Sequence, residues 1–149
     1  MFKIKHFNDL TLNELYEIAK CRYEVFACEQ KIFGENDFDD VDKKCYHIFL
    51  ENDNNITAYA RIIPKEFSSY DDISIGRVLV LQEYRRYKIA KKMMDKAIDF
   101  ITSELNENNI TLSAQEYIKD LYLSCGFIEV SDVYDEVGIP HVKMRYSSN

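Results

Sequence analysis

The chain has 149 residues, of which 30% are charged and 46% hydrophobic, and its formal net charge is −7. This length suits one core and is too short for two, and the composition excludes a disordered chain. No run approaches the roughly 18 apolar residues of a membrane span, and the acidic balance argues against a general nucleic-acid binder. We therefore expect a single domain over residues 1–149, with neither nucleic acid nor membrane as a partner.

The chain begins with signals for a strand and a helix. Residues 1–7 alternate between apolar and polar side chains, which predicts a strand rather than a signal peptide and favours a cytoplasmic protein. The four cysteines form no CxxC pair, as expected of reduced thiols in that compartment. Thr11 and Glu14 form a capping-box pattern, and apolar side chains at helical spacing predict a helix over residues 12–28. The stripe expected to face the core consists of Leu15, Ile18, Ala19, Tyr23 and Phe26.

Residues 29–44 are rich in Asp and Glu and lack a clear period, which predicts an acidic loop or an irregular helix. This segment could attract a cationic amine, or it could be a solvated loop. Residues 37–42 lack the glycine that a calcium loop places at its sixth position. A zinc site built on Cys45 and His47 would lack two further ligands, so we expect no metal.

The remaining segments predict alternating strands and helices. Strands 46–50 and 56–63 flank the polar tract 51–55, which suits a hairpin turn. Gly126 is placed to close a short helix at its C′ position. The later elements are a strand over 74–81, a helix over 89–101, a strand over 110–114, a helix over 117–125 and strands over 127–133 and 141–146. This order predicts an α/β domain with a mixed sheet.

Five cationic side chains gather where the predicted strand 74–81 leads into the helix at residue 89. Free backbone N–H groups and the positive end of the helix dipole converge at such a junction. The pattern predicts an anion-binding site, with a solvated basic face as the alternative. The cations are Arg85, Arg86, Lys88, Lys91 and Lys92.

Residues 85–90, with the sequence RRYKIA, resemble the pyrophosphate loop of the GCN5-related N-acetyltransferases (GNAT), usually written (R/Q)xxGx(G/A). Arg85 and Ala90 match this pattern, whereas Arg86 and Lys88 stand where many members have glycine. The resemblance implies the acyl-CoA N-acyltransferase fold, a mixed central sheet with a splayed strand pair flanked by helices. It also implies acetyl-coenzyme A as cosubstrate, held by main-chain groups of the loop and of the preceding strand. The implied binding residues are Val78, Leu79, Val80, Arg85, Arg86, Tyr87, Lys88, Ile89, Ala90 and Lys91.

Residues 122–127, with the sequence YLSCGF, resemble the YxxxGF element of this family, whose tyrosine hydroxyl points at the cofactor sulfur. The resemblance implies that Tyr122 is a general acid that protonates the departing thiolate. A phenol pKa of about 10 and a thiol pKa of about 8.5 are close enough for this transfer. The alternative is a structural aromatic residue, because the chain has 11 tyrosines and Gly126 is explained as a helix cap.

An ordered series of shorter patterns over nearly the whole chain resembles the ElaA-like branch of this superfamily. The series consists of VFxxEQ at 25–30, the acidic loop, His47, AR at 60–61, IGRV at 75–78 and YxExGIPH at 134–141. Glu29 and His47 are then candidate catalytic residues, with a salt bridge and a buried strand histidine as the respective alternatives. His141 is a candidate substrate-binding residue. Arg61 and Arg77 are also candidates to bind substrate, or they pair with the acidic loop.

These motifs together predict an N-acetyltransferase that transfers an acetyl group from acetyl-coenzyme A to a primary amine by direct attack. The acceptor is expected to be a small molecule or a peptide. The alternatives are a non-catalytic coenzyme A-binding regulatory module and the use of longer acyl chains, as in the fold-related acyl-homoserine lactone synthases. A homodimer is expected only on the general ground that small soluble enzymes often form one.

Overall fold

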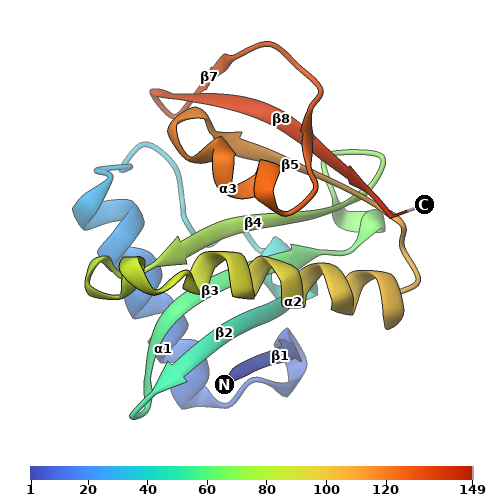
Figure 1. The fold of residues 1–149 in the computed structure, drawn as a ribbon. Coiled ribbons are helices and arrows are strands. Elements are labelled where there is room, and N and C mark those ends of the chain that lie inside the picture. Colours follow the sequence, from blue (N-terminus) through green and yellow to red (C-terminus); the bar gives the residue numbers. More distant parts are fainter. Residues whose placement is uncertain (149) are drawn as a thin grey trace.

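One mixed β-sheet forms the centre of the computed structural model, which describes residues 1–148 (Figure 1). The strand order is β1-β2-β3-β4-β5-β8-β6, and β7 pairs with β8 beside this path. Neighbouring strands are antiparallel except β4 and β5, which are parallel, so the predicted mixed sheet is confirmed. The strands are β1 (Phe2–His6), β2 (Tyr46–Asn52), β3 (Asn55–Ile63), β4 (Ile73–Val80), β5 (Asn109–Gln115), β6 (Ile128–Glu129), β7 (Tyr134–Glu136) and β8 (Ile139–Ser147).

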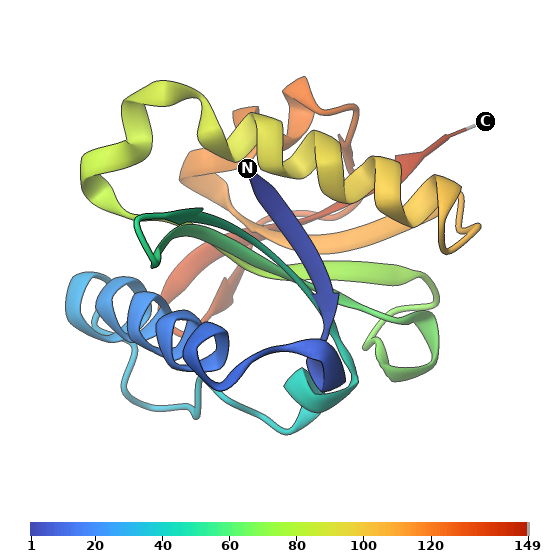
Figure 2. The same ribbon diagram turned by 90° about the horizontal axis from the view of Figure 1, so that it is seen from below.

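Helices cover both faces of this sheet (Figure 2). The larger hydrophobic core lies between the sheet and the helices α2 and α3, and a smaller core lies under α1. Among the helices of residues 1–148, none has both the length and the hydrophobicity of a membrane-spanning segment. The helices are α1 (Leu12–Arg22), α2 (Ile89–Ser103) and α3 (Lys119–Ser124), with the shorter turns η1 (Phe7–Asp9), η2 (Tyr23–Glu29), η3 (Val41–Lys44), η4 (Lys65–Phe67), η5 (Gln82–Tyr87) and η6 (Glu116–Ile118).

Two local signals in the sequence set element boundaries as predicted. The Thr11 hydroxyl accepts the Glu14 N–H at 3.0 Å, and the Glu14 carboxylate accepts the Thr11 N–H at 2.9 Å, which completes the capping box of α1. Asp53 and Asn54, with φ of 51° and 69°, form a two-residue loop between β2 and β3. The predicted hairpin is therefore confirmed.

The end of the first helix differs from the prediction. α1 continues into η2, which is π-helical, instead of remaining α-helical to residue 28. The core-facing position one turn after Ile18 is occupied by Arg22, which is fully buried. Tyr23, predicted to face the core, is instead 64% exposed. The prediction that Tyr23 is buried was wrong, because the buried side chain of this turn is the polar Arg22 and not an apolar residue.

The C-terminal strands also differ from the prediction. The predicted strand 127–133 is only two residues long, as β6, and β7 is an additional short strand. Val137 and Gly138, with φ of 50° and 78°, form a two-residue hairpin loop between β7 and β8. Because a β-branched residue rarely adopts positive φ, the sequence does not signal this turn.

The parallel strands β4 and β5 separate along their length. They pair at Ile73 with Ile110 and at Ser74 with Thr111, whereas β4 continues to Val80 and β5 to Gln115. On its other side β4 stays paired with β3, but a bulge places Arg77 and Val78 opposite a single residue of β3. A bulge bends and twists the strand that contains it, so it turns β4 away from β5. The splayed strand pair is thus confirmed.

Candidate active site

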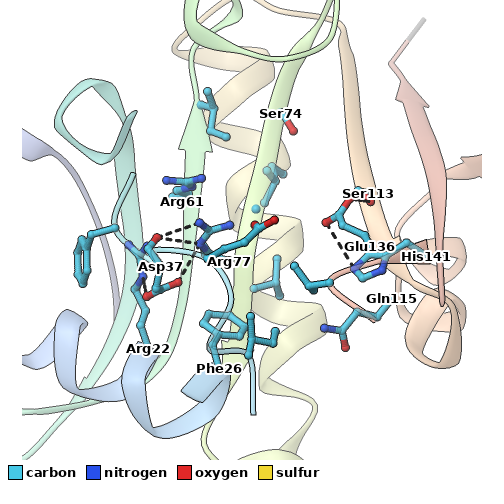
Figure 3. Close-up of a pocket in the computed structure, with 18 of the residues that line it drawn as sticks. Arg22, Phe26, Asp37, Arg61, Ser74, Arg77, Ser113, Gln115, Glu136 and His141 are labelled. Carbon is cyan, nitrogen blue, oxygen red and sulfur yellow. Dashed lines mark hydrogen bonds and ion pairs between the residues drawn. The ribbon is translucent and has the colours of Figure 1, made fainter. Parts of the chain in front are cut away.

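A cavity of about 410 Å³ lies where β4 separates from β5 (Figure 3). Side chains from α1, η2, the acidic loop, β3, β4, β5, α3 and the β7–β8 turn line it. Five of the residues singled out from the sequence meet there, namely Arg61, Arg77, Val78, Tyr122 and His141. Glu29, His47 and the cationic loop are not among the residues that line this cavity.

The main chain of β4 offers hydrogen-bonding groups on its open side. The Leu81 N–H donates to the Thr57 carbonyl of β3 at 2.9 Å, so the main-chain groups of Val80 point away from β3, because successive residues of a strand alternate. By the same alternation Leu79 points its main chain toward β3. The Leu79 and Val80 side chains are buried in different cores. Of these two residues, Val80 is therefore the one whose main chain faces the gap.

The loop after β4 ends in a left-handed residue. Lys88 has φ of 57° and ψ of 28°, and it occupies the position where the GNAT loop pattern has glycine. A non-glycine residue in this region costs about 1 kcal/mol, but it leads the chain into α2 with the geometry that glycine would allow. The Lys92 N–H bonds to the Lys88 carbonyl at 3.3 Å, so the preceding N–H groups of residues 89–91 lie before the helical hydrogen-bond ladder. These groups are available to an anion.

The cations around this loop differ in their partners. Arg85 forms a two-point salt bridge with Glu29, at 2.6 and 2.8 Å, and its Nε donates to the Val80 carbonyl at 2.8 Å. Lys91 pairs with Asp95 at 2.8 Å. Both ion pairs are substantially exposed, and pairs of this kind contribute little to stability. Of the five cations at this junction, Arg86, Lys88 and Lys92 form no ion pair with any of residues 1–148.

Tyr122 lies on α3 at one side of the cavity. A Schellman motif holds it, in which the Phe127 N–H bonds to the Tyr122 carbonyl and Gly126 has φ of 99°. A Cβ at Gly126 would come within 3.2 Å of the Tyr146 ring, so glycine is needed for space as well as for its conformation. The Phe127 ring packs edge-on against Tyr122, and burial raises the pKa of the Tyr122 hydroxyl above its usual value. The phenol is therefore neutral and keeps a proton that it can donate.

Arginines hold the acidic loop against the sheet and make it a wall of the cavity. Arg22 donates to the carboxylates of Asp37 and Asp42, at 2.8 Å each. Its guanidinium also lies 4.1 Å from the centre of the Phe38 ring. We call the six residues Arg22, Arg61, Arg77, Asp37, Asp39 and Asp42 the arginine–aspartate cluster.

The other arginines of this cluster pair with the acidic loop, which is one of the two alternatives that the sequence left open. Arg61 pairs with both carboxylate oxygens of Asp39, at 2.7 and 2.8 Å. Arg77 pairs with Asp37 at 2.9 Å (Figure 3). The Arg61 guanidinium holds the pKa of Asp39 at about 2. Pairing with the acidic loop is therefore what the structure shows for Arg61 and Arg77. The sequence analysis missed Arg22, although its position one turn after Ile18 on the core stripe was a usable signal.

His47 and Glu29 lie in surroundings that differ from a cavity wall. His47 is buried, its Nδ1 lies 2.6 Å from the Tyr59 hydroxyl and its Nε2 lies 3.0 Å from the Asp42 carbonyl. Burial lowers the pKa of His47 to about 4, so the ring is neutral. The hydrogen bonds from Arg85 hold the pKa of Glu29 below its usual value. Glu29 thus forms a salt bridge and His47 is a buried strand histidine, which are the alternatives to a catalytic role that the sequence analysis gave for them.

His141 is at the start of β8 and faces the cavity with a defined tautomer. It is only 5% exposed, and its Nδ1 lies 2.7 Å from the Ile139 carbonyl. Its Nε2 lies 3.7 Å from the carboxylate of Glu136, which in turn accepts a hydrogen bond from the Ser113 hydroxyl at 3.1 Å (Figure 3). The sequence analysis gave Glu136 and Ser113 no role, although Glu136 lies inside the YxExGIPH pattern.

Comparison with known proteins identifies the family. Residues 18–148 match the family model described as an acetyltransferase (GNAT) domain. The chain belongs to the GNAT family. A UPF0039 protein of Schizosaccharomyces pombe is 41% identical to this GNAT chain over 146 residues, which cover 97% of this chain and 95% of the relative. Protein ElaA of Escherichia coli is 34% identical over 140 residues, with 93% and 91% covered.

Solved structures show the same relationship for this GNAT protein. The crystal structure of Escherichia coli ElaA superposes with a TM-score of 0.89 at 31% identity, over 99% of both chains. An acyl-CoA N-acyltransferase from Pseudomonas aeruginosa gives the same TM-score, identity and coverage. The predicted acyl-CoA N-acyltransferase fold and the resemblance to the ElaA-like branch are both confirmed.

Proposed function

We propose that this GNAT protein transfers an acetyl group from acetyl-coenzyme A to a primary amine, by direct attack of the amine on the thioester. The observation that supports the proposal most is the separation of β4 from β5 beside the N-terminus of α2. An extended pantetheine arm can hydrogen-bond to an open strand edge, and a diphosphate suits the free N–H groups at a helix start. The open strand edge and the helix start are adjacent, as are the pantetheine arm and the diphosphate within coenzyme A.

The residues present fit this cosubstrate. The main chain of Val80 points toward the gap, where its carbonyl accepts a hydrogen bond from Arg85 and its N–H is left for the cosubstrate, and Val78 lines the cavity. The free N–H groups of residues 89–91 suit the diphosphate, and the unpaired cations Arg86, Lys88 and Lys92 add charge for phosphates. Leu79, a binding residue implied by the family resemblance, is not assigned to the cosubstrate because its main chain points toward β3. Acetyl-coenzyme A supplies an activated acetyl thioester, and the protein supplies alignment and proton transfer.

Tyr122 is assigned the role of general acid. Tyr122 lines the cavity, and its hydroxyl stays neutral because burial raises its pKa. It donates its proton to the sulfur as the C–S bond breaks, and it takes a proton back from the newly formed amide nitrogen. A neutral donor prevents charge from building up on the sulfur inside a buried site.

A second candidate function is binding of coenzyme A without turnover, as a regulatory module. The observation that favours it is the side chain of Lys88, which stands at the glycine position of the loop and adds a cation there. Such a loop could hold coenzyme A tightly enough to act as a sensor. Turnover distinguishes the two candidates.

The test is acetyl-coenzyme A turnover against a panel of primary amines, with direct binding of coenzyme A measured in parallel. We expect Tyr122→Phe to lower kcat by on the order of 100-fold and to leave the Kd for coenzyme A within about threefold. Tyr16→Phe, on the exposed face of α1, is the matched control and should match the wild type. Binding without turnover of any amine would support the second candidate, and an absence of binding would reject both.

A further inference from the structure

We propose that His141 is the general base that removes a proton from the acceptor ammonium, and that Glu136 is the positioning residue that stabilises the resulting imidazolium. This inference rests on the proposed acetyl transfer. An amine must lose its proton before it can attack a thioester, so the site needs a base as well as an acid. The sequence alone left this base unidentified.

The hydrogen bonds of His141 fix which nitrogen can accept a proton. The Ile139 carbonyl, 2.7 Å from Nδ1, can only accept a hydrogen bond, so Nδ1 carries the hydrogen. The neutral ring therefore keeps its free electron pair on Nε2. The Nε2 atom lies 3.7 Å from Glu136, which is too long for a hydrogen bond and suits an ion pair once the ring is protonated. The arrangement favours proton uptake at Nε2.

The surrounding elements hold this pair beside the reacting region. Figure 3 shows His141 and Glu136 together on one side of the cavity, with Arg77 and Asp37 across from them. His141 shares this cavity with Tyr122, which comes from a different element, α3. The Tyr134 ring stacks on the imidazole with centroids 6.3 Å apart and an interplanar angle of 25°. Acid and base thus reach one cavity from separate parts of the fold.

Other bases at the cavity are less suited to this step. Asp37 is engaged in ion pairs with Arg22 and Arg77. Glu35 is exposed to solvent, and a carboxylate is in general a weaker base than an imidazole. His141 is the buried, cavity-facing imidazole, and its basic nitrogen has a carboxylate beside it.

The proposed proton transfers balance. Nε2 of His141 takes a proton from the ammonium, and the freed electron pair of the nitrogen forms a bond to the carbonyl carbon. The C–S bond breaks with its electron pair on sulfur, which takes the Tyr122 proton. Tyr122 regains a proton from the acylated nitrogen, and the His141 imidazolium releases its proton to solvent. The products are the amide, free coenzyme A thiol and one proton.

The test is chemical rescue of a His141→Ala variant by free imidazole, with the best amine of the panel as acceptor. We expect kcat/KM to fall by at least about 100-fold while the Kd for coenzyme A stays within about threefold. Free imidazole should raise the rate of this variant at least about tenfold, because the deleted ring leaves space beside the cavity. Glu136→Gln, which keeps the ring, should lower kcat by about tenfold. His6→Ala is the control, since His6 lies outside this cavity, and it should neither lose activity nor respond to imidazole.

The outcomes separate this inference from the function on which it rests. If the wild type acetylates an amine and His141→Ala keeps more than a third of its rate, His141 is not the base. A large loss that imidazole does not restore, in a variant that still binds coenzyme A, also overturns the base role. If His141→Ala does not fold, an unchanged rate in Glu136→Gln rejects the proposed pair. A wild type without turnover rejects the proposed function itself.

Discussion

Arg85 and Glu29 show how one pair of residues can link two parts of the site. Arg85 belongs to the loop that matches the GNAT pattern, and Glu29 is the last residue of the π-helical η2, which follows α1. Their side chains are 40% and 37% exposed, so the salt bridge is worth little and a bound phosphate can compete for Arg85. The Glu29 carboxylate then lies close to an anion and opposes its binding.

Removing that carboxylate should therefore strengthen coenzyme A binding without abolishing catalysis. We expect Glu29→Gln to lower the Kd for coenzyme A several-fold at low salt, because a like charge leaves the phosphate site and Arg85 is released. Its kcat should stay within about threefold of the wild type. Titration calorimetry and steady-state rates measure the two quantities, and Glu24→Gln, an exposed carboxylate of the same η2 turn, is the control. A loss of turnover of 100-fold or more with intact binding would instead make Glu29 the base.

The sequence identified which residues lie at the site better than it identified what each of them does there. Tyr122, Val78 and His141 were chosen from family patterns, and all three line the cavity. The partners of Arg22 and Arg61 could not be predicted, because they depend on how residues 35–42 fold back over the sheet. A charged side chain on a core stripe is a signal that becomes interpretable only once its partners are known.

At the scale of elements, the arginine–aspartate cluster gives the irregular segment 30–44 a fixed shape. This segment has no regular structure before η3, so it lacks the backbone hydrogen bonds that stabilise a helix or strand. Three arginines, from α1, β3 and β4, replace them with ion pairs to Asp37, Asp39 and Asp42. The cavity wall therefore depends on carboxylates that must stay ionised.

This dependence predicts that the protein loses the stability contributed by Asp39 when the pH is lowered. The pKa of Asp39 is about 2 in the fold, against an ordinary value of about 3.9, so its contribution is complete above about pH 4. The contribution is lost as the pH falls from about 4 to 2. We expect Asp39→Asn to lower the Tm at pH 7. The difference in Tm between this variant and the wild type should disappear by about pH 2. Asp40→Asn is the control, because its carboxylate is 95% exposed, and a gap that persists at pH 2 would contradict this account.

The regular elements were largely predictable, and the exceptions have local physical causes. α2 matches the predicted helix closely because its buried residues recur at helical spacing from Met93 to Ile101. β7 was missed because its turn uses Val137 at positive φ, which no residue preference signals. The π-helical η2 was missed because its sequence has an ordinary helical composition.

At the scale of the whole molecule, the function proposed here depends on a sheet that is continuous at one end and open at the other. The two cores hold β3 and β4 together from both faces, so the opening between β4 and β5 does not separate the two halves of the sheet. Such a splay is a long-range property of strand pairing. No local pattern predicts it, and only the family resemblance led us to expect it.

The most direct test of the central claim is amide hydrogen exchange measured by NMR, with and without saturating coenzyme A. The account predicts that the N–H groups of Val80 and of residues 89–91 become protected when the cosubstrate binds. The amides of Asp53 and Asn54, in the β2–β3 turn, should exchange at an unchanged rate. If coenzyme A binds and these amides of β4 and α2 exchange as fast as before, the claim that the open strand and the helix start hold the cosubstrate is contradicted.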